Sequence, residues 1–297
     1  MRAFLSALTL AIAASLHNGS VSANEYPLSD SVWKGHEVSP RNGLPDGTFA
    51  ISTNTNGQEV AAWYGSPTTR YRHGILGDAV EAGSLHVEYR GGQRYEFQLP
   101  DSQVFEDRTP RIVDLDRDGR LEIVTIRSYR NAGASVAVFG VRNGELVVLA
   151  STAAIGRSNR WLNIAGIEDY AGRGSLQIAY VETPHIGGTL HFVEWSGNKL
   201  QPIASTFGAS NHEIGSRDQD LSADVDYDKD NQLDIVVPSN DRRTLRTFGF
   251  SGGQLVELSA VPLSSPVARR AKADETQKTG CVHFELRNRS TFEFCRP

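Results

Sequence analysis

The sequence has few cysteines, almost no methionine and no excess of basic residues. Among its 297 residues are 2 cysteines and 1 methionine, the initiator. So few cysteines exclude a small scaffold held together by many disulfides. The 30 Lys and Arg residues are outnumbered by 35 Asp and Glu residues, which gives a formal net charge of -5. Because nucleic-acid-binding proteins normally present a basic surface, this balance argues against nucleic acid as a partner.

Long hydrophobic runs are also missing, except at the N-terminus. Arg2 precedes an uncharged, mostly apolar run from Ala3 to Leu16, which is too short for a membrane-spanning helix. Val21 and Ala23 place small residues at the -3 and -1 positions of a cleavage site. These features predict a signal peptide over residues 1–23 and an exported protein, periplasmic or extracellular, without a membrane span.

The two cysteines, Cys281 and Cys295, are expected to form a structural disulfide. The segment 281–295 alternates apolar and polar residues, and a hairpin turning about Asn288 would place the two cysteines directly opposite each other. The oxidising environment of an exported protein favours this bond. Two free thiols or a redox pair are the alternatives, although the sequence has no Cys-x-x-Cys motif.

Hairpin-like segments recur four times in the chain. Each has an alternating strand, a turn containing Gly-Gly, Asn-Gly or Gly-Asn, and a second strand. The residues that precede the turns are spaced by 52, 54 and 55 positions and are Tyr89, Val141, Trp195 and Phe250. An Asp-containing element upstream repeats with spacings of 55 and 57, at Asp114, Asp169 and Asp226. The repeats therefore cover about 48–99, 110–150, 162–205 and 219–260.

A four-stranded unit of this length, repeated around a ring, is typical of a β-propeller blade. We therefore predict an all-β fold: a single β-propeller domain over 24–297 with about five four-stranded blades. The stretch Trp33–Val38 and the C-terminal hairpin would jointly form or complete the fifth blade. A stacked solenoid is the alternative architecture. Val267–Lys278 is the only segment that we interpret as a short helix.

Two loops of the repeats carry carboxylates at positions 1, 3, 5 and 9. They are Asp114, Asp116, Asp118 and Glu122 in one loop, and Asp226, Asp228, Asp230 and Asp234 in the other. Alternate carboxylates on a tight turn converge on one hard cation such as Ca²⁺, and without it they repel one another. The position-7 carbonyls of Arg120 and Gln232 are further candidate ligands. An EF-hand would need an acidic residue at position 12, where Thr125 and Val237 stand.

With Ile-Val strands on either side, these loops resemble the FG-GAP/VCBS repeats of integrin-like propellers and of many secreted bacterial proteins. The resemblance covers residues 48–260 and is most specific over 114–124 and 226–236. It implies a propeller with calcium bound between the first two strands of its blades. The third copy has Ala171 and Arg173 in place of carboxylates, and the first, around Asn54, is neutral. We therefore expect two calcium sites, with a solvated acidic turn as the alternative.

Candidate ligand-binding residues lie in the connections between strands. Two connections carry Ser-Asn followed by a cationic or titratable residue, and a histidine lies in a third. The candidates are Asn159, Arg160, Trp161, His185, Asn211 and His212. Together they would form a polar, aromatic-edged pocket for a sugar, a carboxylate or a peptide. In the alternative interpretation the asparagines cap turns and Trp161 packs between blades.

No established catalytic motif is present in the sequence: Gly-x-Ser-x-Gly, His-Glu-x-x-His and a phosphate-binding glycine loop are all missing. The favoured hypothesis is therefore a calcium-stabilised binding or interaction module with a glycan or protein ligand, not an enzyme. A carbohydrate-active enzyme of the lyase or dehydratase kind and a periplasmic assembly factor are the alternatives.

Overall fold

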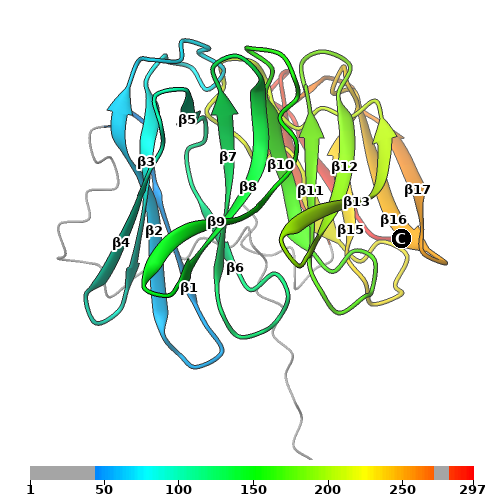
Figure 1. The fold of residues 1–297 in the computed structure, drawn as a ribbon. Helices are drawn as coiled ribbons and strands as arrows, with labels where there is room; N and C mark the ends of the chain where they lie inside the picture. The colour runs from blue at the N-terminus through cyan, green and yellow to red at the C-terminus, as the bar shows by residue number, and fades with distance from the viewer. Residues whose placement is uncertain (1–43, 271–280) are drawn as a thin grey trace, which may run out of the picture.

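Short apolar–polar alternations separated by glycine-rich turns fold as antiparallel strands. The computed structural model describes residues 44–270 and 281–297, and within these ranges the fold is all-β without a helix (Figure 1). No helix in this part of the chain could therefore cross a membrane. The predicted signal peptide and the stretch Trp33–Val38 lie outside the described residues.

The first and largest sheet has nine strands. Its members are β1 (Phe49–Thr53), β2 (Glu59–Thr68), β3 (Glu81–Tyr89), β4 (Gln93–Gln98), β5 (Gln103–Phe105), β6 (Arg111–Val113), β7 (Glu122–Tyr129), β8 (Gly133–Arg142) and β9 (Glu145–Ser151). The short strand β5 pairs with both β3 and β7. It thereby joins two four-stranded units, unit 1 (β1–β4) and unit 2 (β6–β9), into one sheet.

Three smaller antiparallel sheets follow along the chain. Unit 3 consists of β10 (Leu162–Glu168), β11 (Gln177–Glu182), β12 (Thr189–Ser196) and β13 (Lys199–Phe207). Unit 4 consists of β14 (Ala223–Val225), β15 (Asp234–Pro238), β16 (Thr244–Ser251) and β17 (Gln254–Pro262). Unit 5 has three described strands, β18 (Val267–Arg270), β19 (Cys281–Leu286) and β20 (Thr291–Cys295).

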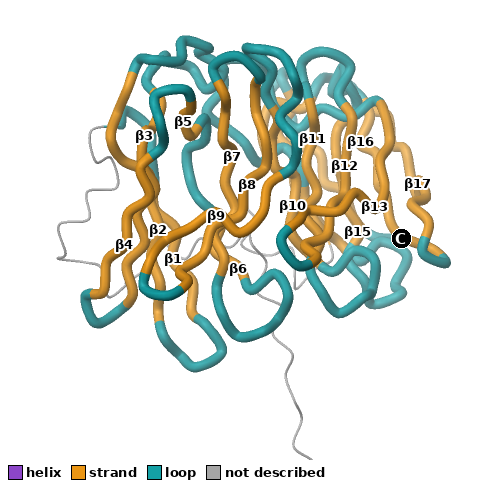
Figure 2. Tube along the Cα trace, in the orientation of Figure 1, coloured by secondary structure: helices purple, strands orange, loops and turns teal. Residues whose placement is uncertain are grey.

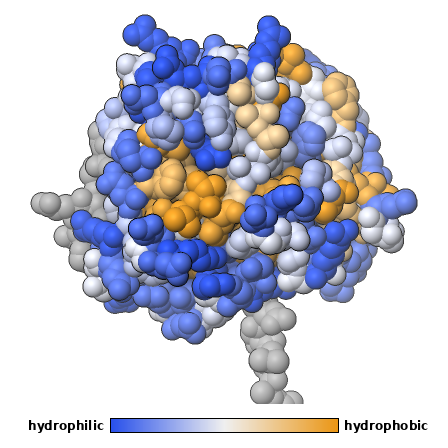
Figure 3. Space-filling model, in the orientation of Figure 1, coloured by the Kyte–Doolittle hydropathy of each residue, from blue (hydrophilic) through white to orange (hydrophobic). Residues whose placement is uncertain are grey.

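The units stand side by side, and their strands run between two loop-covered ends of the molecule (Figures 1 and 2). A hydrophobic cluster lies between each pair of consecutive units, and its largest buried side chains include Phe139, Trp161, Phe192 and Phe284, in chain order. On the face drawn in Figure 3, apolar side chains form a band across the middle and hydrophilic side chains cover both ends. The packing of one unit on the next therefore holds the fold together.

The units repeat in backbone detail as well as in strand order. Strands β8, β12 and β16 each have a register shift against the following strand, directly after Val138, Phe192 and Thr247. Each of these residues lies three positions before the residue that precedes the turn, namely Val141, Trp195 and Phe250. The turn between β8 and β9 has the conformation that its Asn-Gly pair predicts. Asn143 and Gly144 both have a positive φ, of 54° and 81°. Such a pair suits the tight turn of a two-residue hairpin loop.

The C-terminal hairpin has the predicted register. Cys281 pairs with Cys295 across β19 and β20, and the two form a disulfide with a Cα–Cα distance of 3.9 Å. The prediction of a short helix over Val267–Lys278 is wrong for its described part. Val267–Arg270 instead form β18 and pair with β19, because an open edge of that hairpin is available to them. Tertiary strand pairing here outweighs a local helical pattern.

Candidate functional site

The two acidic loops lie between the first two strands of units 2 and 4, at one end of the molecule. Residues 114–121 connect β6 to β7, and residues 226–233 connect β14 to β15. The first of these loops is prominent at the lower edge of Figure 1. We call the end of the molecule that carries the two acidic loops the loop end. The connections that lead from each unit to the next lie at the other end.

In the β6–β7 loop, three of the four predicted carboxylates converge. Oxygens of Asp114, Asp116 and Glu122 all lie within 4.8 Å of one another. The Asp114 carboxylate also accepts the backbone N–H of Gly119 at 2.8 Å, which fixes the turn around it. The fourth, Asp118, is outside this group and pairs with Arg120, which lowers the pKa of this carboxyl.

In the β14–β15 loop, oxygens of Asp226, Asp228 and Asp230 also lie within 4.8 Å of one another. The Asp226 Oδ1 atom is buried and has no hydrogen-bond partner. Burying such an atom costs free energy unless a donor or a cation compensates it. Three carboxylates at this spacing, together with an unsatisfied oxygen on one of them, suit a Ca²⁺ ion, which accepts carboxylate ligands in flexible geometry.

The position-9 carboxylates, Glu122 and Asp234, are the most buried acids of their loops. Burial raises the pKa of each to about 7. Opposing contacts only partly offset burial: Arg142 contacts Glu122 Oε1 at 2.9 Å, and the Tyr227 N–H donates to Asp234 Oδ2 at 2.8 Å. A neighbouring cation would favour the ionised form of both groups. Asp234 is outside the converged group of its loop.

The third loop, between β10 and β11, has the same turn as the β6–β7 loop but keeps only the carboxylate at position 1, Asp169. Asp169 accepts the N–H groups of Arg173 and Gly174 at 2.8 Å each, as Asp114 accepts those of Asp118 and Gly119. Positive φ angles also recur at positions 4 and 6 of three loops, at Arg117, Gly119, Gly172, Gly174, Lys229 and Asn231. The Arg173 side chain pairs with Glu194 at 3.1 Å. Lacking the carboxylates at positions 3 and 5, this loop has no comparable cation site.

Loops of consecutive units touch each other at the loop end. The Leu176 N–H donates to the Leu115 carbonyl at 2.9 Å, which joins the loops of units 2 and 3. The Tyr170 hydroxyl donates to Asp224 Oδ1 at 2.6 Å, which joins units 3 and 4. A cation in either acidic loop would therefore stiffen a contact between units as well as the loop itself.

At the other end, three of the predicted ligand-binding residues meet. His185 Nε2 and His212 Nδ1 are 2.9 Å apart, and the Trp161 ring packs against both imidazoles. His212 is fully buried, and its Nε2 lies 2.9 Å from the Ser216 carbonyl. Because a carbonyl only accepts, this contact places the His212 proton on Nε2 and leaves Nδ1 to accept from His185.

Burial lowers the pKa of His185 to about 4 and that of His212 to about 3. Both imidazoles are therefore neutral at pH 7, and His212 Nδ1 keeps the lone pair that accepts from His185 Nε2. Trp161 is 2% exposed and donates from Nε1 to the Glu106 carbonyl at 2.9 Å. This arrangement matches the alternative in which Trp161 packs between units.

The other predicted residues do not join this cluster. Asn211 is buried, and its side-chain amide donates to the carbonyls of Asn163 and Ile164 at 3.3 Å each. Asn159 is exposed in a left-handed turn with φ of 56°, and Arg160 follows it. The two similar Ser-Asn segments therefore have different environments. Asn211 is buried against unit 3, whereas Asn159 lies at the surface.

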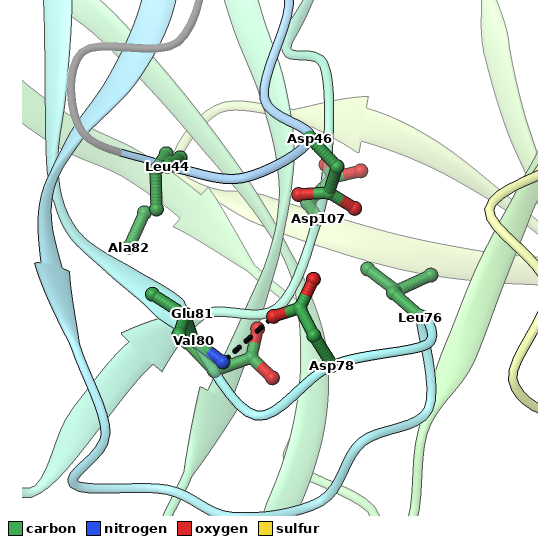
Figure 4. A pocket seen from close by; sticks show the side chains of 8 residues that line it. All are labelled: Leu44, Asp46, Leu76, Asp78, Val80, Glu81, Ala82 and Asp107. Atoms are coloured by element: carbon green, nitrogen blue, oxygen red, sulfur yellow. Dashed lines mark hydrogen bonds between the residues drawn. The ribbon is translucent and has the colours of Figure 1, made fainter.

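The same end contains an acidic cavity that the sequence did not reveal. Its volume is about 10 Å³, room for about one water molecule, and its lining combines acidic with apolar side chains (Figure 4): Leu44, Asp46, Leu76, Asp78, Val80, Glu81, Ala82 and Asp107. The residues come from three separate segments. No spacing signal unites them, and an acid between Val80 and Ala82 is the one weak local sign.

No family model and no curated protein matches this sequence. Among solved structures, the chain is similar to one described as the crystal structure of BBS1N in complex with ARL6DN, soaked with mercury. The TM-score is 0.51 at 9% sequence identity, and the match covers 85% of this chain and 66% of that chain. The matched structure is a β-propeller, so the likeness assigns this chain a β-propeller-like fold and shows the fold alone.

Proposed function

We propose that this chain is an exported, calcium-stabilised β-propeller that acts as a binding module for a glycan or protein ligand. Units 1 to 4 would be four blades, and unit 5 would be the core of a fifth. In this proposal the FG-GAP/VCBS-like loops hold calcium at the loop end, and the ligand binds at the other end.

One observation carries the proposal: carboxylates gather at both ends of the molecule, in two different arrangements. At the loop end they converge within 4.8 Å in equivalent loops of two units, as ligands of a cation would. At the other end they line a cavity formed by connections from separate parts of the chain. Connections at the end of a rigid β scaffold are where such folds commonly bind ligands.

Three carboxylates from one loop would hold each ion. These are Asp114, Asp116 and Glu122 in unit 2, and Asp226, Asp228 and Asp230 in unit 4. The cation would compensate the negative charge of the three carboxylates that hold it. The side chains themselves fix the turns, through hydrogen bonds such as that from the Gly119 N–H to Asp114.

Calcium stoichiometry tests this part of the proposal. Protein stripped with chelator and titrated with calcium should bind two ions per chain, and its melting temperature should rise. Asp116→Asn and Asp228→Asn should each remove one ion, because each loses a charged oxygen ligand. Asp169→Asn is the matched control, since it occupies position 1 of the loop without the other carboxylates, and it should leave both ions. The absence of bound calcium in elemental analysis would refute the two sites.

Ligand binding is tested separately, with calcium-loaded protein on a glycan array and in cross-linking to exported proteins. Saturable retention of a glycan, competed by the same glycan free in solution, supports the glycan branch.

A further inference from the structure

Four arginines gather at the end of the molecule opposite the acidic loops. Arg72 lies in the connection from β2 to β3, Arg130 in the turn from β7 to β8, and Arg157 and Arg160 in the connection from β9 to β10. They come from three separate segments, so the sequence shows no basic cluster here. We call these four residues the arginine surface.

Hydrogen bonds hold the three segments side by side. The Ser158 hydroxyl donates to the Arg130 carbonyl at 2.7 Å, which joins the β9–β10 connection to the β7–β8 turn. The Asn159 N–H donates to the Tyr71 hydroxyl at 2.9 Å, which joins the same connection to the β2–β3 connection. The backbone that carries the four arginines is therefore fixed before any ligand arrives.

Gly133, at the start of β8, shows how closely two of these segments pack. Its φ is 77°, and a Cβ atom at this position would lie only 2.7 Å from the Arg160 carbonyl oxygen and nearer still to that of Arg157. No real Cβ could occupy that space, so the position requires glycine. The β9–β10 connection thus rests directly on the β7–β8 turn.

None of the four guanidinium groups has an acidic partner within the part of the chain that the structure describes. Arg70, in the same connection as the first of them, provides the contrast. It donates to the Gln103 carbonyl at 2.8 Å and pairs with Asp101 at 3.2 Å. Arg160 donates only to the Asn159 carbonyl beside it, at 3.1 Å. The arginine surface therefore presents uncompensated positive charge.

The acids of the cavity at this end do not neutralise the arginine surface. Burial raises the pKa of Glu81 to about 10, so this group is uncharged at pH 7. Each of the three aspartates has an arginine of its own: Asp46 pairs with Arg108, Asp107 with Arg111 and Asp78 with Arg217. The positive charge is thus a local exception in a chain whose formal net charge is -5.

The chemistry of the surface suits carboxylates on a hydroxyl-rich molecule. A planar guanidinium can donate two parallel hydrogen bonds to one carboxylate, and it stays charged at every pH at which proteins are folded. Exposed amides lie among the arginines, at Asn131 and Asn159. An amide offers both a donor and an acceptor, as sugar hydroxyls require.

A membrane surface suits this region less well than a sugar polymer does. Proteins that bind anionic lipids commonly add apolar side chains that enter the interface. The large hydrophobic residues that are exposed in the described ranges lie in or beside the connections from β11 to β12 and from β13 to β14, and they are Ile186, Phe207 and Ile214. The arginine surface itself has charged and polar neighbours.

We infer that the arginine surface binds a polysaccharide whose sugars carry carboxylates, as uronic acids do. The inference rests on the proposed binding function and selects a ligand class within it. The carboxylates would accept hydrogen bonds from the guanidinium groups, and the hydroxyls would bind the exposed amides. An extended acidic chain needs no enclosed cavity, because it carries charge at regular intervals along its length.

Binding of a hyaluronan decasaccharide to the calcium-loaded full chain tests the inference. Saturable binding is expected at pH 7 and low ionic strength, and it should weaken as salt is added, because exposed charges are screened. The methyl ester of the same decasaccharide keeps the sugar backbone without the charge and should not bind. A single-stranded DNA decamer and phosphatidylglycerol vesicles, at equal concentrations of anionic groups, should bind more weakly than hyaluronan.

Arg130→Gln combined with Arg157→Gln should lower the hyaluronan affinity about tenfold or more, because two charge-assisted hydrogen-bonding groups are lost. Arg289→Gln with Arg296→Gln is the matched control, since it removes the same charge from two exposed arginines of unit 5, and its affinity should equal that of the wild type. If the first variant melts at a lower temperature, the corresponding double Lys variant decides. It keeps the charge and loses the forked donors, so its affinity should lie between those of the Gln variant and the wild type.

Four results would overturn the inference: no saturable hyaluronan binding, equal binding of the methyl ester, tighter binding of DNA or vesicles, or an unchanged affinity in the double Gln variant. Calcium stoichiometry would be unaffected by any of them. Retention of a neutral glycan on the array would leave the proposed function intact while this ligand class fails. The two failures are therefore distinguishable.

Discussion

At the scale of single residues, burial sets the protonation of two neighbouring histidines. Burial keeps His185 and His212 neutral. They form a hydrogen bond, with 2.9 Å between His185 Nε2 and His212 Nδ1. Both have a folded-state pKa below their ordinary value of 6.5. Protonation therefore favours the unfolded chain, and the stabilisation is complete only above pH 6.5.

The free energy of unfolding should consequently fall as the pH drops from 6.5 toward 4. In that window the unfolded chain takes up protons that the folded one refuses, at about 1.4 kcal/mol per pH unit for each proton. His185→Gln should reduce the slope by about one proton, measured by urea unfolding at several pH values. An unaltered slope in His185→Gln would contradict this account.

At the scale of elements, the third loop separates backbone conformation from ligand chemistry. Its turn matches that of the β6–β7 loop, including the two N–H groups bound by Asp169. A loop that already has the conformation needs only the missing oxygens to bind a cation.

Ala171→Asp combined with Arg173→Asp should therefore create a third calcium site. The two changes supply carboxylates at positions 3 and 5 and remove a positive charge. The expected result is one additional ion per chain by elemental analysis. Ala171→Asn with Arg173→Gln, which supplies neutral oxygens only, should bind calcium far more weakly. Unchanged stoichiometry in the double Asp variant would show that the shared turn is not sufficient.

Features that depend on neighbouring residues in the chain could be predicted from the sequence. The Cys281–Cys295 register follows from apolar alternation about one turn, and the hairpins follow from pairs such as Asn143–Gly144. The β18 strand was missed because its partner is a later hairpin. The acidic cavity could not be predicted either, since its lining comes from three segments that are distant in the sequence. These segments come together only when the chain folds.

At the scale of the whole molecule, calcium is expected to act on contacts between units. Because the Leu176–Leu115 hydrogen bond joins two loops beside an acidic site, removing the ion should loosen it. Amide hydrogen exchange at Leu176 should accelerate about tenfold in chelator, which corresponds to about 1.4 kcal/mol of lost local stability. Val282, in the disulfide-linked hairpin, should exchange at an unchanged rate. Equal rates at Leu176 with and without calcium would place the stabilisation elsewhere.

The strand β5 makes the molecule mechanically uneven. It links units 1 and 2 by backbone hydrogen bonds on both of its edges, whereas separate sheets form units 3, 4 and 5. Under tension, the first two units must break the β5 strand pairing, whereas the later units meet through side-chain packing and single backbone hydrogen bonds such as that from Leu176 to Leu115. A stretched chain would therefore yield first among its later units, and the N-terminal pair would bear load as a single piece.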